Sequence, residues 1–463
     1  MSSSAIRFRE LLIGGVLDED ASGPAPVPQK RGDDLKKAKL QVLVFGGGYM
    51  GQLGLGGGVK KLASPQPLEL PECRHVACGA AFSAAVSTDG RVYTWGDGAE
   101  GQLGYELSGA GARRAKPRLV EALSGTPVRA VCAGREHALA VTFDGELWAW
   151  GNNDHGQLGT GDHRDAVLPQ RLEDVAGAAG RVARFHGVAA GDFHCAAVTR
   201  RGELFTWGYG AHGQLGHGDG AEPTATASTT AAGAAAVASS SSSAARAELS
   251  ELAPRQVFAL SDAAVRSINC GAATTAAVTR TGLCFLFGAT EKLALPGDAS
   301  ADARQFAFTP IEIGFRGARV EEASCGKGHV LLRTADGDVY AAGAGGAGQL
   351  GSGRAVDCGR PRLVLKGKRV ISIAAGRYHS LAVTAHGAIF SFGMGEHGQL
   401  GHGTEQAEVV PRVLGSMLMR AVLRVACGEH HTLCLSTALI EDDGDGSNAR
   451  LPPDVVVWKV RPA

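Results

Sequence analysis

Apolar residues along much of this chain come in short runs that a glycine interrupts. In the stretch from His137 to Trp150, the runs His-Ala-Leu-Ala-Val-Thr and Leu-Trp-Ala-Trp flank Asp144-Gly145. Each run is too short for a stable helix and is rich in residues that favour strands. Asp-Gly is a strong hairpin signal, because glycine accepts a positive φ without steric cost. The pattern therefore predicts a β-hairpin over residues 137–150.

The same pattern returns along the chain in a fixed register. Each repeat has three landmarks. The first is Gly-x-x-His, the second is a turn glycine, and the third is an aromatic or small residue before glycine, as Gly134, Gly145 and Gly151 illustrate. The tetrapeptide Gly-Gln-Leu-Gly then follows, and it begins at Gly51, Gly101, Gly156, Gly213, Gly348 and Gly398. A period of roughly 50 residues is typical of solenoids and propellers. One unit, after Phe287-Gly288, has lost the tetrapeptide and keeps only Leu295 at its leucine position.

The two ends of the repeat array are half-units. The chain starts its array with a second half, Val42 to Gly54, and finishes with a first half, Val422 to Ser436. Pairing these halves in one composite sheet gives seven units and removes the free sheet edges of an open array. The sequence therefore predicts an all-β fold: a seven-bladed β-propeller of four-stranded antiparallel blades, closed by pairing the N- and C-terminal half-blades.

Segments outside the repeat differ in composition. Residues 1–39 are predicted to be a flexible tail, residues 40–438 the propeller, and residues 439–463 a C-terminal extension. Within the propeller, residues 219–253 are rich in Ala, Ser and Thr and are predicted to be a disordered insertion between blades, because such a stretch buries little apolar surface.

Composition and charge exclude several classes of protein. The 463 residues carry a formal net charge of zero, which argues against nucleic acid as a partner. No apolar stretch is long enough to span a membrane. The ten cysteines include no Cys-x-x-Cys pair, and this pattern favours a reducing compartment, the cytoplasm or the nucleus. Four cysteines stand at one repeat position where other units have Ala, which indicates small buried residues: Cys78, Cys270, Cys325 and Cys427.

Motifs that could carry chemistry are explained by the repeat. Gly-x-Gly-x-x-Gly recurs, as from Gly96, but Gln-Leu-Gly and no helix pattern follows it, so no nucleotide cofactor is expected. The repeat histidines occupy one register in different blades and cannot converge on a metal ion. They are predicted to make structural hydrogen bonds within each blade. The structural pairs are Gly134 and His137, Gly191 and His194, Gly326 and His329, Gly376 and His379, and Gly428 and His431. No Gly-x-Ser-x-Gly elbow occurs, and the chain is not expected to be an enzyme.

These repeats resemble the regulator of chromosome condensation repeat family, whose members are seven-bladed β-propellers. The resemblance covers about residues 40–438 and rests on the register of the Gly-x-x-His and Gly-Gln-Leu-Gly motifs. It implies a protein-interaction propeller, a scaffold or regulatory module that binds protein partners and no small-molecule substrate.

Variable residues between the third landmark and Gly-Gln-Leu-Gly are the candidate partner-binding positions. Equivalent loops of a ring project on one side, and these mix acidic, histidine and aromatic residues, as recognition surfaces do. They are Asp97, Glu100, Asp154, His155, Tyr209, His212, Glu396 and His397. Ordinary polar turns are the alternative explanation of the same residues.

The resemblance leaves two further functions open. One is guanine-nucleotide exchange on a Ran-like small GTPase, for which the family's exchange factor uses acidic and histidine loop residues and a protruding β-wedge hairpin. Asp154 loosely matches an acidic loop position, His379 and His431 match only the shared repeat, and the connection from Gly159 to Pro169 is too short for a wedge. The other is UV-B sensing, for which the similar plant receptor clusters tryptophans in Gly-Trp-Arg-His-Thr repeats. Here no tryptophan stands between the glycine and the histidine.

Overall fold

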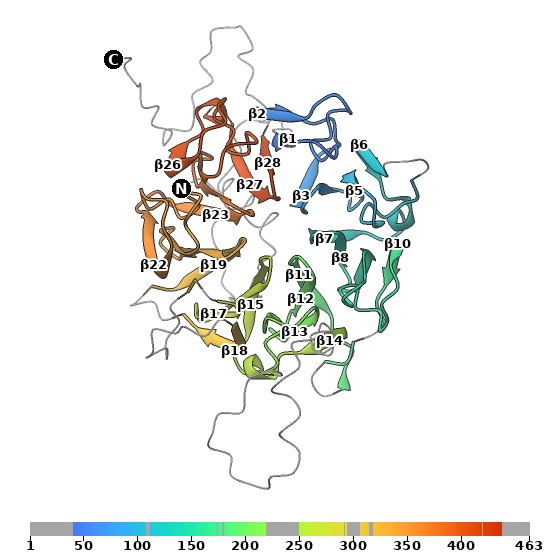
Figure 1. Cartoon of the computed structure of the whole chain (residues 1–463). Coiled ribbons are helices and arrows are strands. Elements are labelled where there is room, and N and C mark those ends of the chain that lie inside the picture. The colour runs from blue at the N-terminus through green and yellow to red at the C-terminus, as the bar shows by residue number, and fades with distance from the viewer. Residues whose placement is uncertain are drawn as a thin grey trace, which may run out of the picture.

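The computed structural model describes residues 40–437, except for 108–111, 174, 178–179, 219–249, 291, 294–305, 314–317 and 419. Within these ranges the chain forms seven four-stranded antiparallel sheets that surround a central axis (Figure 1). This confirms the predicted all-β, seven-bladed propeller. The part of the chain that is described contains no helix with the length and hydropathy needed to span a bilayer.

Each blade runs from an inner strand at the axis to an outer strand at the rim. Blade 1 contains β27 (Val422–Cys427), β28 (His431–Thr437), β1 (Leu40–Gly47) and β2 (Lys61–Pro67); blade 2 contains β3 (Cys73–Cys78), β4 (Phe82–Ser87), β5 (Val92–Asp97) and β6 (Arg113–Leu119). Blade 3 contains β7 (Val128–Ala133), β8 (His137–Thr142), β9 (Leu147–Gly151) and β10 (Ala166–Arg171); blade 4 contains β11 (Phe185–Ala190), β12 (His194–Thr199), β13 (Leu204–Gly208) and β14 (Glu251–Gln256). Blade 5 contains β15 (Val265–Cys270), β16 (Thr274–Thr279), β17 (Cys284–Ala289) and β18 (Phe306–Glu312). Blade 6 contains β19 (Val320–Cys325), β20 (His329–Thr334), β21 (Val339–Gly343) and β22 (Cys358–Leu365); blade 7 contains β23 (Val370–Ala375), β24 (His379–Thr384), β25 (Ile389–Gly393) and β26 (Glu408–Val413). Three short 3-10 helices, η1 (Glu121–Leu123), η3 (Phe258–Leu260) and η4 (Gly415–Met417), precede inner strands.

Blade 1 closes the ring as predicted. Strand β1 pairs with β28 in antiparallel register from Leu40 opposite Thr437 to Gly46 opposite His431. The start and the end of the described chain therefore share one sheet. The inner strands of blades 1 and 2, β27 and β3, contact each other as the inner strands of other neighbouring blades do.

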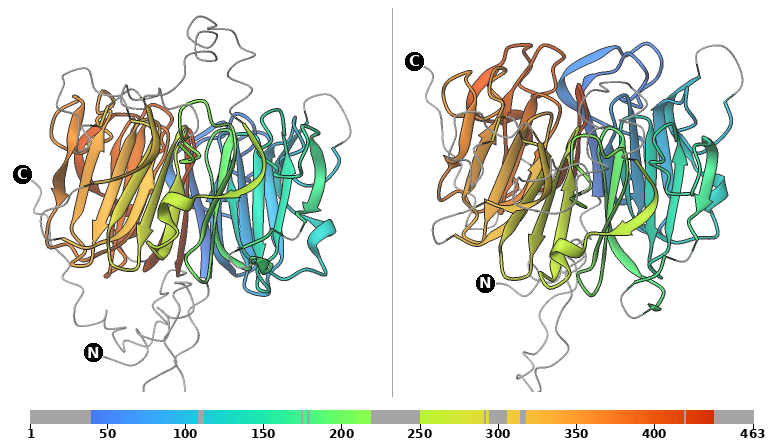
Figure 2. Two further views of the ribbon diagram at one scale, coloured as in Figure 1. Left: turned by 90° about the horizontal axis from the view of Figure 1, so that it is seen from below. Right: turned by 60° about the horizontal axis from the view of Figure 1, so that its bottom comes forward.

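The disc has two faces that the strand order defines (Figure 2). The loop face carries the Gly-x-x-His turns between the first two strands of each blade and the Gly-Gln-Leu-Gly loops between the last two. The hairpin face carries the turns between the second and third strands, which contain glycines such as Gly145, and the connections between blades. Because the second strand of each blade runs from one set of turns to the other, the two sets lie on opposite faces.

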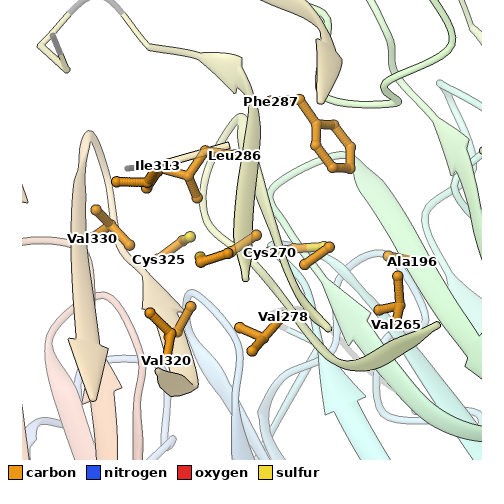
Figure 3. Packing of buried hydrophobic residues seen from close by; sticks show 14 of the residues in the cluster. Ala196, Val265, Cys270, Val278, Leu286, Phe287, Ile313, Val320, Cys325 and Val330 are labelled. Carbon is orange, nitrogen blue, oxygen red and sulfur yellow. The ribbon is translucent and has the colours of Figure 1, made fainter. Parts of the chain in front are cut away.

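The apolar core lies between the blades. In one cluster, Leu53 and Leu433 of blade 1 pack with Val76 and Trp95 of blade 2. Figure 3 shows the same arrangement between blades 5 and 6, where Leu286 lies near Cys325. The third-landmark aromatics are fully buried: Phe45, Trp95, Trp150, Trp207, Phe287 and Phe392. At about 25 cal/mol per Å² and roughly 200 Å² per ring, each buried indole contributes on the order of 5 kcal/mol before the entropy of ordering is subtracted.

Two local features differ from the sequence analysis. Strand β14 begins at Glu251, so the last three residues of the segment 219–253 belong to the rim of blade 4 rather than to an insertion. In the connection between β10 and β11, Ala176 and Val182 form an antiparallel bridge, which makes a small hairpin on the hairpin face. Leu295 lies outside the described residues, and Leu293 is buried in the core beside it in sequence.

Candidate interaction surface on the loop face

The Gly-Gln-Leu-Gly loops are rigid because each glutamine bonds in two directions. Its side-chain Oε1 accepts the backbone N–H two residues earlier, as Gln102 does from Glu100 at 2.9 Å. Its backbone oxygen accepts from the next blade, as Gln102 does from the Trp150 Nε1–H at 2.9 Å. The flanking Gly101 and Gly104 both have a φ of +78°, which explains the glycines. The residues just before the tetrapeptide are therefore held on a fixed frame.

The repeat histidines connect neighbouring blades. Each Nε2 lies at hydrogen-bond distance from a hydroxyl or thiol of the next blade: His137 and Cys195 (3.0 Å), His194 and Thr275 (2.9 Å), His329 and Ser380 (3.0 Å), His379 and Thr432 (3.1 Å), His431 and Ser83 (2.9 Å). The structural role was predicted, but placing the side-chain bonds within each blade was wrong. The cause is blade packing, which brings the second strand of the next blade over the imidazole.

These hydrogen bonds also set the protonation of the histidines. The Ser380 hydroxyl donates to the Gln349 carbonyl at 2.8 Å, so it accepts from the Nε2–H of His329. The imidazole is therefore the neutral Nε2–H form. Burial agrees with this state, since it lowers the pKa of His137 to about 3 and that of His329 to about 4. The repeat histidines are structural groups that no partner can reach.

Three acidic candidates gather on the loop face of blades 2 and 3. Glu100 has a raised pKa, first because it is partly withdrawn from water and then because carboxylates surround it. Those carboxylates are Glu136, Asp165, Asp154 and Asp97. Sequence reasoning selected Asp97, Glu100 and Asp154 but missed Glu136, which lies in a Gly-x-x-His turn, and Asp165, which ends the same β9–β10 loop as Asp154. We call these five residues the acidic group.

His155, Tyr209 and His212 belong to a second set, a row of rings in edge-to-face and tilted contact. The His155 ring lies 4.9 Å from that of Tyr209, and the Tyr209 ring lies 5.5 Å from that of His212. Phe193 extends the row at 5.0 Å from His155, and Phe306 extends it at 4.9 Å from His212. The rings are half-buried and pass from blade 3 across blade 4 to blade 5. Both phenylalanines were missed because one lies in a Gly-x-x-His turn and the other on a rim strand.

Glu396 and His397 lie apart from both sets. The His397 ring contacts that of His430, with centroids 4.2 Å apart, and that of Tyr49 at 6.0 Å. Glu396 acts on the pKa of His430, which burial and the neighbouring His397 lower. These residues belong to blades 7 and 1. The eight predicted residues thus share one face but form three separate groups.

A shallow hollow of about 100 Å³ marks the axis on the same face. The residues that follow the repeat glycines line it, and they include both acidic and basic side chains. Arg377 pairs with Glu429 at 3.0 Å, Arg135 lies 4.0 Å from Asp192, and the Lys327 ammonium donates to the Tyr378 hydroxyl at 3.1 Å. The described residues hold no group of three histidine, cysteine or acidic side chains arranged for a metal ion.

Comparison with known proteins decides the family. The RCC1-like domain matches residues 188–438, and the regulator of chromosome condensation (RCC1) repeat matches residues 41–86, 89–141 and 144–198. The chain belongs to the RCC1 repeat family. The match confirms the resemblance that the repeat motifs indicated.

This RCC1-repeat chain matches one curated relative over most of that protein's length and others over a small part of theirs. The ultraviolet-B receptor UVR8 of Arabidopsis thaliana is 31% identical over 354 residues, which are 70% of this chain and 77% of UVR8. The E3 ubiquitin-protein ligase HERC2 of Homo sapiens is 31% identical over 381 residues, which are 75% of this chain but only 8% of HERC2. The chain therefore corresponds to a small part of that ligase.

Solved structures show the same RCC1-type fold. Human WBSCR16 superposes with a TM-score of 0.70 at 23% identity and covers 87% of this chain and 100% of that one. Prp20p of Saccharomyces cerevisiae, a protein studied for its binding to Gsp1p and histones, superposes with a TM-score of 0.72 at 22% identity, covering 88% and 94%. At these identities the likeness concerns the fold alone.

Proposed function

We propose that this RCC1-repeat propeller is a protein-interaction module, a scaffold or regulatory unit whose docking surface is the loop face. The observation that carries the proposal is the contrast between two sets of histidines. Those in the repeat are sealed between blades, while His155 and His212 are presented on hydrogen-bonded loops beside Tyr209 and the acidic group. A fixed frame that displays mixed acidic and aromatic side chains suits recognition of a protein.

Two points support a module without catalytic activity of its own. Two of the repeat cysteines at the axis, Cys270 and Cys325, are buried, and burial raises the pKa of Cys270 to about 12, so its thiol is a poor nucleophile. The E3 ligase relatives match this chain over a small fraction of their length, so their ligase activity does not transfer with the propeller. We expect the protein in the cytoplasm or the nucleus, where its cysteines stay reduced.

Guanine-nucleotide exchange is less well supported than docking. His379 and His431, which match the exchange factor only through the shared repeat, have no exposed surface. The small hairpin at Ala176 and Val182 lies on the hairpin face, opposite the acidic group. Adding the protein to a Ran-like GTPase loaded with labelled GDP tests this function directly, and we expect no acceleration of GDP release.

Affinity capture with charge-reversed variants tests the proposed docking surface. Asp97→Lys combined with Asp154→Lys reverses two charges of the acidic group, while Asp262→Lys combined with Asp336→Lys reverses two exposed charges away from it. We expect the first pair to lose partners that the wild type and the second pair both retain, at an unchanged melting temperature. Identical partner sets for all three proteins would reject the loop face as the docking surface.

A further inference from the structure

The hairpin face carries a continuous arc of arginines across five consecutive blades. Its members are Arg74 of blade 2, Arg129 of blade 3, Arg200 of blade 4, Arg280 of blade 5 and Arg319 of blade 6. We call this set the arginine arc. Arg74 and Arg129 stand second in their inner strands, near the axis, while the other three lie in turns or connections on the same face and are exposed.

Contacts from blade to blade hold the arc in place. The Arg74 guanidinium lies 4.8 Å above the centre of the Phe143 ring. An Nη2–H of Arg200 donates to the Phe143 carbonyl at 3.4 Å, Arg280 donates to the Arg200 carbonyl at 2.6 Å, and Arg319 donates to the Arg280 carbonyl at 3.1 Å. Arg200, Arg280 and Arg319 each use one of their five N–H donors in this way, so most of their donors remain available.

The arc lacks local neutralisation. Two other arginines of this face are paired, Arg91 with Asp89 at 2.9 Å and Arg266 with Glu321 at 2.8 Å. None of the five arc residues makes an ion pair with a described carboxylate. The Glu321 carboxylate, which feels the charge of Arg319, is already engaged by Arg266.

Like charges therefore stand close together. The pKa of Arg129 is lowered first by burial and then by the positive charges of Arg200 and Arg74, which shows that these three groups interact. The whole chain has zero net charge, and the acidic group lies on the opposite face of the disc. A run of unpaired guanidiniums fixed by main-chain contacts is preorganised for carboxylates or phosphates.

Apolar surface beside the arc distinguishes a protein ligand from a nucleic acid. Phe143, under Arg74, is 39% exposed, and Leu283, three residues after Arg280, is 43% exposed. An acidic peptide with an apolar side chain would satisfy both the guanidiniums and these surfaces. A nucleic acid would have to bind a chain without net positive charge, which lacks the long-range attraction that polyanions require.

We propose that the arginine arc is a second docking surface, which binds an acidic protein segment rich in Asp and Glu and carrying an apolar residue. This inference does not depend on the loop face, because it concerns the opposite side of the disc. It predicts that one molecule can bind two partners of different chemistry at once, one at each face.

Binding of defined probes to the full chain tests the proposal. The probes are a fluorescent 12-residue peptide of Asp and Glu with one central Leu, its Asn and Gln counterpart, and a labelled single-stranded oligonucleotide. We expect the acidic peptide to bind, the neutral peptide to bind at least about tenfold more weakly, and salt to reduce the difference, as surface ion pairs require. Tighter binding of the oligonucleotide than of the acidic peptide would overturn the assignment.

Matched variants locate the binding. Arg200→Gln with Arg280→Gln removes two charges from the arc, whereas Arg91→Gln with Arg171→Gln removes two charges from paired arginines and gives the same net charge. We expect about a tenfold loss of acidic-peptide affinity for the first pair only, with both variants melting as the wild type does. Equal losses of peptide affinity in the two double variants would overturn the proposal. Far tighter peptide binding by a chain truncated after residue 438 would also overturn it, because the acidic run Glu441 to Asp445 would then be the segment that binds the arc.

Discussion

The glycine of each Gly-x-x-His turn is required by the space around it. A Cβ at Gly134 would lie 2.1 Å from the Cε1 atom of His137 and 2.7 Å from the carbonyl oxygen of Gly191 in the next blade. The imidazole is locked by its bond to Cys195, and the carbonyl belongs to main chain, so neither neighbour can move easily. The turn, the histidine and the next blade therefore form one packed unit.

Substitution of this glycine tests that unit. We expect Gly134→Ala to destabilise the propeller by about 1–3 kcal/mol, the usual range for overpacking, measured by urea unfolding. Gly125→Ala is the matched control, because a Cβ there meets nothing within 4 Å and its φ is not positive. We expect the control to lie within about 0.5 kcal/mol of the wild type. Equal stability of the two variants would contradict the steric argument.

Buried neutral histidines make the propeller sensitive to acid. Burial, helped by the nearby His431, His329 and His430, lowers the pKa of His379 to about 3, against about 6.5 in an unfolded chain. Between these values the unfolded state binds the extra proton. The stabilisation is therefore complete above about pH 6.5 and is lost as the pH falls toward 3, by up to about 1.4 kcal/mol per pH unit for each such histidine.

Unfolding midpoints at pH 7.5, 6.5 and 5.5 measure this dependence. We expect the midpoint to fall steadily with pH, and His379→Gln to be less stable at pH 7.5 but to show a shallower fall. His163→Gln, a change at an exposed loop histidine, should reproduce the wild-type slope. A wild-type midpoint that stays constant over this range would show that the repeat histidines titrate normally in the folded protein.

At this scale the sequence revealed which residues matter but not what they contact. The register alone identified His137 and its counterparts as structural. Their partners could not be predicted, because the acceptor differs from blade to blade, from Ser83 to Cys195 to Thr275, and faces the histidine only once two blades have packed. The rings of Phe193 and Phe306 were missed for a similar reason, since their contacts cross blade boundaries.

At the scale of the element, the tryptophan of the third landmark connects its blade to the Gly-Gln-Leu-Gly loop of the preceding blade. Trp150 is fully buried in β9, and its Nε1–H donates to the Gln102 carbonyl at 2.9 Å. Trp148 lies two residues earlier on the same strand, packs against the same core cluster as Trp150, and its Nε1 has no partner among the described residues. The two residues separate the hydrogen bond from the effect of losing an indole.

Paired substitutions measure this hydrogen bond. Trp150→Phe removes the bond and leaves the Gln102 carbonyl without its indole donor, so we expect a loss of about 2–4 kcal/mol from the bond and the smaller ring together. Trp148→Phe removes an indole that makes no such bond, and we expect a loss smaller by at least about 1 kcal/mol. Chemical denaturation measures the unfolding free energy of both variants. Equal losses of stability would show that buried apolar area, and not the hydrogen bond, accounts for the contribution of Trp150.

Elements were predictable wherever the repeat was intact. The hairpin expected over residues 137–150 is β8 and β9, with the turn at Gly145. Rim strands were harder to place, because they are exposed and lack a period-two pattern. Strand β14, Glu-Leu-Ala-Pro-Arg-Gln, is only half-buried, and it was assigned in part to the preceding low-complexity segment. No sequence motif predicts the bridge between Ala176 and Val182.

At the scale of the whole molecule, the ring shape followed from counting half-units, and the faces followed from the strand order. The distribution of charge over those faces did not. The acidic group draws Asp97, Glu136 and Asp165 from distant parts of the chain, and the arginine arc takes one residue from each of five blades. Position within a repeat predicts the face on which a residue lies. Only the closed ring shows which blades are neighbours, so the acidic group and the arginine arc could not be predicted from a sequence with zero net charge.

Closure itself can be tested by removing the residues that make it. A chain without Val422 to Thr437 loses β27 and β28, so β1 keeps only β2 as a partner strand, and the apolar residues Val42, Val44 and Leu53 lose Leu433 and Leu435. Blades 2 and 7 would each expose the side that blade 1 covers. We expect this variant to lose the cooperative thermal transition of the wild type, because each blade depends on both neighbours for its core. Truncation after residue 438 removes no described strand and should retain the transition. If the deleted chain melts as sharply and at the same temperature as the truncated one, then the shared blade does not hold the propeller together.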